Sequence, residues 1–222
     1  MNALLLVGSP KPGRSASRSF GEAVLQRLDA RGATTRVERV TPVLRSAAAL
    51  ASRLEDIAWA DLVVLSFPVY VDSLPAPVTR LLEAWADAAP GSTPPASEPK
   101  RLAVLTQCGF PEAHQCATAV EVCREFCREV GVRWAGALTF GTGGALEGRA
   151  VERSPLARVA GAFDDAADAL MAGREIPDHV RSALAKPIAR SWIYTWFGGL
   201  GWWWLARKRG NRQPLRLRRY VQ

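Results

Sequence analysis

Residues 3–17 read ALLLVGSPKPGRSAS, and this stretch decides the fold. Its first five residues are apolar without interruption, which is typical of a strand that is buried on both faces of a parallel sheet. A Gly-Ser-Pro loop follows, and apolar residues then recur at helical spacing, which predicts a helix over residues 18–31. The order of strand, glycine-containing loop and helix indicates the start of an α/β domain.

The alternation of strands and helices continues along the chain. Further strands are predicted at residues 33–40, 61–67, 101–106 and 133–140, and further helices at residues 47–60, 77–88, 114–130 and 155–172. Repeated units of this length form parallel sheets with right-handed crossovers and with helices on both faces. The sequence therefore predicts a three-layer α/β/α sandwich with a five-stranded parallel sheet.

The composition changes after residue 175, which predicts a domain at residues 1–175 and an extension at residues 176–222. Ten of the 29 Lys and Arg residues follow Asp178, whereas none of the 21 Asp and Glu residues does. Five of the eight tryptophans lie between residues 191 and 206. That apolar stretch is shorter than the roughly 20 residues that cross a bilayer, and its three glycines disfavour a helix.

Several roles remain open for this Trp- and Arg-rich extension. Tryptophan beside clustered arginine suits a membrane interface, so peripheral membrane contact through residues 191–219 is one interpretation. Packing against the body or against a second subunit is another. Nucleic acid is not an expected partner, because no recognition motif accompanies the charge.

The loop at residues 8–17 is a predicted anion site. A loop between a strand and a helix N-terminus offers unpaired backbone N–H groups and the positive end of the helix dipole. We expect Ser17 to cap the helix. The side chains that suit an anion are the hydroxyls of Ser9, Ser15 and Ser17 and the cations of Lys11 and Arg14.

The same loop nearly fits the nucleoside-triphosphate P-loop pattern, G-x-x-x-x-G-K-[ST]. Arg14 stands where that pattern requires lysine, and Pro10 and Pro12 each remove an N–H donor. A P-loop enzyme also needs an acidic residue at the end of a strand to hold Mg²⁺, but Asp61 precedes its strand. The phosphate of a flavin nucleotide is therefore the favoured anion.

Three motifs together resemble the NAD(P)H-dependent FMN reductase family over roughly residues 1–170. They are GSPKPGRSAS after the first strand, FPVYVDSLPAPVTRLLEAW after the third and TQCGF after the fourth. The resemblance implies a flavodoxin-like fold, bound FMN, NAD(P)H as co-substrate and a homodimer. It also implies that the first loop holds the ribityl phosphate, with Ser9, Lys11, Ser15, Ala16 and Ser17 at the matching positions.

The flavin ring is expected at the ends of the third and fourth strands. The resemblance matches the segment Pro68, Val69, Tyr70 and Val71, where an aromatic wall and backbone N–H groups suit the ring. Cys108, Gly109 and Phe110 are expected at its pyrimidine end, with Gly109 permitting close backbone approach. Tyr70 and Phe110 are equally compatible with ordinary packing at the rim.

The predicted function is an FMN-dependent NAD(P)H oxidoreductase that passes electrons to a small acceptor such as a quinone or a flavin. The alternative is a non-catalytic flavodoxin-like electron carrier or scaffold. No catalytic side chain and no metal site are identified. Cys116, Cys123 and Cys127 share one helix face and are interpreted as buried apolar residues. The short N-terminal apolar run is not a secretion signal, so a cytoplasmic protein is expected.

Overall fold

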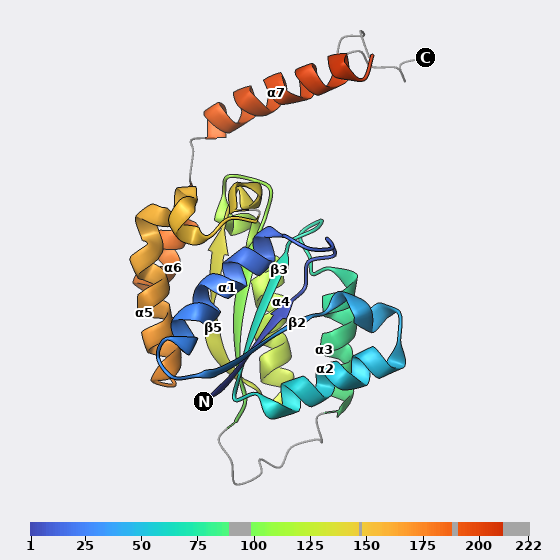
Figure 1. The fold of residues 1–222 in the computed structure, drawn as a ribbon, viewed down its shortest axis with the longest axis vertical. Helices are drawn as coiled ribbons and strands as arrows, with labels where there is room; N and C mark the ends of the chain where they lie inside the picture. The colour runs from blue at the N-terminus through green and yellow to red at the C-terminus, as the bar shows by residue number, and fades with distance from the viewer. Residues whose placement is uncertain (89–98, 147, 188–190, 211–222) are drawn as a thin grey trace. The chain divides into compact units, whose positions relative to one another are not determined.

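The computed structural model describes residues 1–88, 99–146, 148–187 and 191–210. Figure 1 shows the helices and strands along the chain. In chain order they are β1 (Asn2–Val7), α1 (Ala16–Asp29), β2 (Thr34–Arg39), η1 (Thr41–Leu44), α2 (Ala47–Trp59), β3 (Leu62–Pro68), α3 (Ala76–Ala88), β4 (Arg101–Gln107), η2 (Ala113–Cys116), α4 (Ala117–Val130), β5 (Arg133–Phe140), η3 (Gly143–Leu146), η4 (Val151–Arg153), η5 (Pro155–Val159), α5 (Ala160–Met171), α6 (Asp178–Ala185) and α7 (Ser191–Lys208).

The strands form one parallel sheet in the order β2-β1-β3-β4-β5. The chain moves outward from β1 in one direction and then returns to continue on the other side, so the strand order switches beside β1 and β3. In sheets of this kind, ligands bind outside the carboxyl ends of the strands near that switch. The predicted five-stranded parallel sheet and its flanking helices are therefore confirmed.

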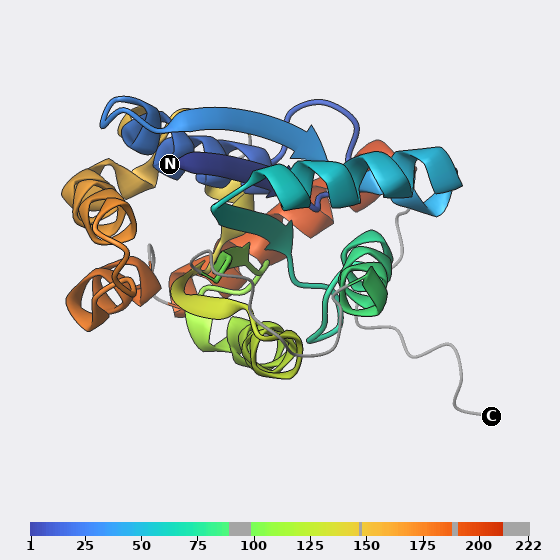
Figure 2. The same cartoon turned by 90° about the horizontal axis from the view of Figure 1, so that it is seen from below.

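Alternate residues of the buried strands face two separate cores. On β1, Leu5 faces one core, whereas Leu4 and Leu6 face the other, and all three are almost inaccessible to solvent. This arrangement explains why the strand is apolar at every position. Figure 2 shows the consequence, with α2 and α3 on one side of the sheet and α5 and α6 on the other.

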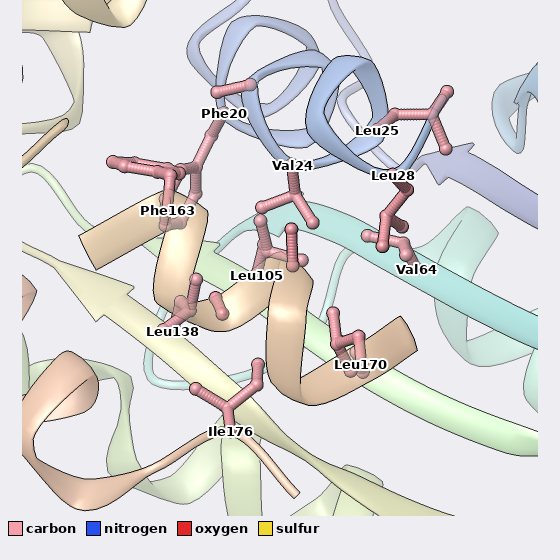
Figure 3. Packing of buried hydrophobic residues seen from close by; sticks show 14 of the residues in the cluster. Phe20, Val24, Leu25, Leu28, Val64, Leu105, Leu138, Phe163, Leu170 and Ile176 are labelled. Carbon is pink, nitrogen blue, oxygen red and sulfur yellow. The ribbon is translucent and has the colours of Figure 1, made fainter. Parts of the chain in front are cut away.

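The first core joins α1, α5 and α6 to the sheet (Figure 3). Phe20 of α1 is at its centre, with its ring edge-on to Phe140 at a centroid distance of 4.7 Å and to Phe163 at 5.7 Å. Edge-to-face rings add to the stabilisation that burial provides. The packing fixes the start of α1 relative to the ends of β4 and β5.

The second core lies under α2, α3 and α4. Cys123 and Cys127 of α4 are buried there beside strand residues such as Val104, and Cys116 is buried at the junction of η2 and α4. The prediction that these cysteines behave as small apolar side chains is confirmed. All four cysteines are free thiols.

Two predicted helices start later than expected. The helix expected from residue 114 consists of the 3₁₀ turn η2 followed by α4, and the helix expected from residue 155 consists of η5 followed by α5. Pro155 opens η5, where a missing N–H donor costs nothing. A 3₁₀ turn is a common way to begin an α-helix, and the hydrophobic period does not distinguish it from the helix.

The end of the domain lies beyond the expected boundary at 175. Ile176, Val180 and Leu184 are buried in the first core, and α6 contacts β5 and α5. The chain divides into one compact unit at Met1–Ile188 and a second at Ala189–Gln222. The helical period of these three apolar residues, rather than the local charge, determines where the first unit ends.

The second unit contains α7, whose helical structure corrects the expectation drawn from its glycines. Gly198, Gly199 and Gly201 all lie inside the helix. A glycine weakens a helix by about 1 kcal/mol relative to alanine but keeps its N–H donor, so the helix continues through it. No helix in the described part of the chain is both long and apolar enough to cross a membrane.

Candidate functional site

The loop from Gly8 to Ser15 connects β1 to α1 at the carboxyl edge of the sheet. The N–H of Gly8 donates to the carbonyl of Ser66 on β3 at 2.7 Å. A Cβ atom on Gly8 would overlap side-chain atoms of Val78 and Phe67, so only glycine fits here. The loop therefore leaves β1 in close contact with β3.

The helix cap of α1 is Ser15, not Ser17 as predicted. The Ser15 Oγ accepts a hydrogen bond from the N–H of Arg18 at 3.2 Å, and its backbone is extended. Ala16 is the first residue of the helix. The sequence Ser-Ala-Ser contains two serines that could each cap the helix, and the first of them is the cap. The loop and the helix N-terminus together form an anion-binding type of structure.

Ser17 is instead buried in the first turn of α1, where it connects two neighbouring strands. Its Oγ accepts from Gln107 Nε2 at 2.9 Å, and its carbonyl accepts from the Ser66 hydroxyl at 2.7 Å. Ser17 and Gln107 are 1% and 3% exposed. These bonds bring the ends of β3 and β4 to the first turn of α1.

Ser9 and Lys11 lie in the loop itself. The Ser9 side chain is buried and accepts from the N–H of Lys11 at 3.3 Å, whereas the side chains of Lys11 and Arg14 are exposed. Gly148 packs against the side chain of Arg14, where an added Cβ would lie 3.0 Å from Cδ. The loop thus combines buried hydroxyls with exposed cations.

Arg39, the last residue of β2, and Thr41, the first residue of η1, support the loop and were missed by sequence reasoning. Arg39 Nη2 donates to the carbonyl of Lys11 at 2.7 Å, and the Thr41 hydroxyl donates to the carbonyl of Ser9 at 3.1 Å. The position of β2 beside β1 places both residues next to the loop. Knowledge of the strand order would have been needed to predict these two contacts.

The second predicted loop begins at Pro68, the last residue of β3. The N–H of Val69 donates to the carbonyl of Gln107 at 2.9 Å, which continues the contact with β4. Tyr70 and Ser73 then exchange two backbone hydrogen bonds, each at 3.1 Å. The segment is a tight two-residue hairpin, and the Tyr70 side chain is 46% exposed.

The turn of this hairpin is strained. Val71 and Asp72 have φ values of 50° and 57°, in the left-handed region that glycine and asparagine prefer. Val71 is β-branched and 97% exposed, so no packing interaction offsets the cost of about 1–3 kcal/mol. Backbone strain that no packing interaction offsets is typical of ligand-binding turns.

The third predicted loop, Cys108 to Glu112, follows β4. Gly109 and Phe110 are exposed, and the Phe110 side chain is 59% accessible. The Cys108 side chain is buried and its Sγ lies 3.5 Å from the carbonyls of Phe110 and Glu112. The Cys108 thiol therefore turns toward its own loop, which leaves the backbone as the part suited to a ligand.

The loop after β5 holds this third loop in place. The N–H of Gly143 donates to the carbonyl of Cys108 at 2.9 Å, and the N–H of Thr142 donates to the carbonyl of Phe110 at 2.6 Å. Thr142 has a φ of 59°, which makes it the third strained residue at this edge of the sheet, after Val71 and Asp72. The loop after β5 therefore supports the candidate site.

Cys108 and Cys116 form a thiol pair beneath the third loop. A hydrogen bond from the Cys116 thiol and the backbone N–H groups nearby lower the pKa of Cys108. The same contact and burial raise the pKa of Cys116 far above its usual value. The contact between the two thiols therefore shifts their pKa values in opposite directions.

The residues at this edge fit a flavin mononucleotide. Gln107 Oε1 is buried and has no hydrogen-bond partner among the described residues, and the Gln107 side chain is bonded to Ser17 beside the anion loop. A ribityl chain carries hydroxyl donors that suit such an acceptor. Tyr70 and Phe110 add exposed aromatic rings on two loops of the same edge. A phosphate, a polyol and a flat ring would each find a matching group.

The P-loop alternative needs an acidic residue at the end of a strand beside the first loop, and β3 (LVVLSFP) contains none. Asp61 precedes β3 and accepts a hydrogen bond at 2.7 Å from the N–H of Asn2, at the start of β1. Its carboxylate is therefore at the amino edge of the sheet, opposite the loop of residues 8–15. It cannot hold a metal ion beside an anion bound there.

The fold and the site define a doubly wound α/β protein with its candidate ligand loops at the carboxyl edge of the sheet. The family model Flavodoxin_2, described as a flavodoxin-like fold, matches residues 1–118, and the chain belongs to this family. The predicted flavodoxin-like relationship is thereby confirmed. No curated protein sequence matches the chain significantly.

Solved structures agree with this fold. An NADH:FMN oxidoreductase in its apo form is 18% identical with a TM-score of 0.58, and the match covers 81% of this chain and 93% of that one. A quinone reductase described as putative from Klebsiella pneumoniae is 16% identical with a TM-score of 0.56, covering 80% and 87%. A flavodoxin from Streptococcus pneumonia TIGR4 is 15% identical with a TM-score of 0.53, covering 78% and 99%.

Proposed function

We propose that the chain is an FMN-dependent NAD(P)H oxidoreductase with a small electron acceptor such as a quinone or a flavin. The observation that carries the proposal is the convergence of the loops after β1, β3 and β4, joined by the bonds of Ser17 to Ser66 and Gln107. Membership of a flavodoxin-like family supports it. So do the names of similar folds, which include FMN and quinone reductases.

Each loop has a separate task in this proposal. The α1 N-terminus, with Ser9, Ser15 and Lys11, binds the phosphate through N–H groups, hydroxyls and positive charge. Gln107 accepts from the ribityl chain. Tyr70 and Phe110 bound the ring and exclude water from its edges, while the backbone of the loops after β3 and β4 orients it.

When bound, FMN supplies the redox chemistry, taking a hydride from NAD(P)H and passing electrons to the acceptor. The protein side chains position the groups and contribute no covalent step. A nicotinamide site separate from the flavin is not required, because donor and acceptor can use one open face of the ring in turn.

The test is FMN uptake followed by reduction. The purified full chain is titrated with FMN, and the loaded protein is mixed anaerobically with NADH or NADPH while flavin absorbance is followed. Stoichiometric uptake and rapid bleaching support an oxidoreductase. Uptake without bleaching by either nucleotide indicates the electron-carrier alternative, and failure to take up FMN rejects both.

The homodimer and the cytoplasmic location stay predictions. Light scattering of the eluting full chain measures the first, and a mass of twice 24.1 kDa is expected. Fractionation of the producing cells measures the second, with recovery from the cytoplasmic and membrane fractions compared.

A further inference from the structure

Helix α7 has large apolar side chains on several sides. Among its described side chains, Trp196, Trp202 and Trp204 are 60%, 69% and 60% exposed. With 100° between successive residues, these three indoles point in three different directions around the helix axis. Residues 191–206 contain no charged residue. The helix therefore lacks the polar stripe of an ordinary surface helix.

Positive charge is concentrated at the carboxyl end of this helix. Arg207 and Lys208 are the last two residues of α7, separated from Trp204 by Leu205 and Ala206, and Arg209 follows the helix. The Arg207 guanidinium lies 4.4 Å from the centre of the Trp203 ring, and the Lys208 ammonium lies 5.1 Å from the centre of the Trp204 ring. Each of these cations is thus held beside an indole by a cation–π contact.

The positive charge of the segment that contains α7 indicates what kind of surface this segment binds. Ten Lys and Arg residues and no Asp or Glu follow Asp178. Two copies of such a segment would repel each other, which disfavours a second copy of this chain as the partner. An anionic surface would be attracted over the whole segment.

The arrangement of the aromatic and basic residues favours lipid over nucleic acid. Proteins that follow a phosphate backbone interleave cations with stacking rings along a groove. In α7 the indoles form one uncharged stretch and the cations gather beyond it. Indole prefers the boundary between headgroups and acyl chains, and arginine prefers lipid phosphate, so the two parts of α7 match two adjacent layers of a membrane.

We propose that α7 docks the protein on an anionic lipid surface. The indoles of Trp196, Trp202, Trp203 and Trp204 lie among the headgroups, and Arg207, Lys208 and Arg209 lie against lipid phosphates. The docking is peripheral, in keeping with the finding that no helix in the described part of the chain is both long and apolar enough to span a bilayer. It involves no residue of the proposed flavin site.

The experiment uses the full chain and vesicles of phosphatidylcholine with or without phosphatidylglycerol. Sedimentation measures the bound fraction at low and at high salt, and tryptophan emission reports the environment of the indoles. We expect binding to the anionic vesicles with a blue shift, weak binding to pure phosphatidylcholine, and release by salt. Acyl chains brominated near the headgroup are expected to quench the emission.

Matched variants separate the helix from general charge. Replacing Arg207, Lys208 and Arg209 with glutamine removes three charges, and partitioning is expected to fall on the order of 100-fold. The control Arg80→Gln/Arg124→Gln/Arg128→Gln removes three exposed charges from α3 and α4, and partitioning is expected to change less than threefold. The variant Trp202→Ala/Trp203→Ala/Trp204→Ala is expected to lose both the binding and the blue shift.

Three outcomes overturn the proposal. The first is absence of binding to anionic vesicles by the full chain. The second is an equal loss in the α7 variant and the control, because charge alone would then explain the binding. The third is absence of vesicle binding combined with a concentration-dependent dimer or with duplex binding that the α7 variants abolish. FMN uptake by the same samples is measured separately, so failure of the flavin proposal is recognised independently.

Discussion

The strained residue Val71 offers a test in which a surface substitution increases stability. Asparagine tolerates the left-handed region far better than valine does, and the exposed Val71 side chain has few contacts to lose. Val71→Asn is therefore expected to raise the free energy of unfolding by about 1 kcal/mol. Denaturant unfolding of the FMN-free protein measures it.

Val122 provides the matched control for this substitution. It is 45% exposed on α4, where the backbone is helical. Val122→Asn is expected to change stability by at most a few tenths of a kcal/mol. Equal effects at both positions would show that the turn stores no strain.

The cations of the first loop are expected to recognise phosphate rather than the flavin ring. Lys11→Gln/Arg14→Gln is expected to weaken FMN binding about tenfold, in line with exposed charge pairs. Riboflavin, which lacks the phosphate, is expected to bind the variant as it binds the original protein. Fluorescence titration of both flavins measures this difference.

Arg18 supplies the comparison for the loop cations. Arg18 is an exposed residue of α1, the helix that follows the loop, and it forms an ion pair with Glu22 at 2.7 Å. Arg18→Gln is expected to leave the ratio of FMN to riboflavin affinity nearly unchanged. A similar loss of both ligands in the Lys11 and Arg14 variant would contradict a phosphate role.

At the scale of single residues, the sequence predicts what kind of group a loop binds, but it predicts less well which individual side chain makes each contact. The hydroxyls and cations of residues 8–17 predict an anion-binding loop. The structure shows that Ser15 caps the helix and that the Ser17 hydroxyl is hydrogen-bonded to Gln107. Two serines separated by one residue look equivalent in the sequence until the first turn of the helix is placed. The role of Arg39 could not be predicted from the sequence, because its contact with the loop depends on β2 lying beside β1.

At the scale of elements, the loop after β5 is expected to determine the position of the loop after β4. A Cβ atom at Gly141 would overlap the carbonyl groups of Phe110 and Pro111, which are backbone atoms with little freedom to move. Gly141→Ala is therefore expected to lower stability by about 1–3 kcal/mol and to weaken FMN binding. Thermal unfolding and FMN titration measure the two effects.

Gly144 is the control in the same loop. Nothing lies within 4 Å of a Cβ atom built on it. Gly144→Ala is expected to leave both stability and FMN binding almost unchanged. If Gly141→Ala behaved like this control, the two loops would not be coupled.

The order of strands and helices followed from hydrophobic period, but the extent of some elements did not. Apolar residues at a helical period predicted α4 and α5, yet that period cannot tell a 3₁₀ turn from the first turn of a helix. In α7, composition argued against a helix because glycine is costly. The remaining residues of the segment nevertheless keep the helix continuous across three glycines.

At the scale of the whole molecule, the position of a truncation is expected to determine whether the first unit survives. A chain that ends at residue 187 keeps α6 and the complete first core, so its melting temperature and FMN binding are expected to stay close to those of the full chain. A chain that ends at residue 175 loses the buried side chains of Ile176, Val180 and Leu184.

The shorter truncation is expected to cost about 5 kcal/mol, the transfer free energy of three buried apolar side chains. That loss is a large part of the stability of an ordinary domain. Thermal unfolding of both truncations beside the full chain measures the difference. Equal stability of the two would mean that α6 is an appendage and that the boundary predicted from composition was adequate.

The rim of the candidate site is connected by main-chain bonds. Gly8 is bonded to β3, Val69 to β4, and Gly143 to Cys108, in each case from an N–H group to a carbonyl. These bonds use main-chain atoms alone, and two of the three donors are glycines at which a Cβ atom would overlap a neighbour. The exposed side chains of Tyr70, Val71 and Phe110 are thus free to change without loosening the frame. In the proposed oxidoreductase, acceptor preference is therefore expected to change with substitutions at these few surface positions while the scaffold stays the same.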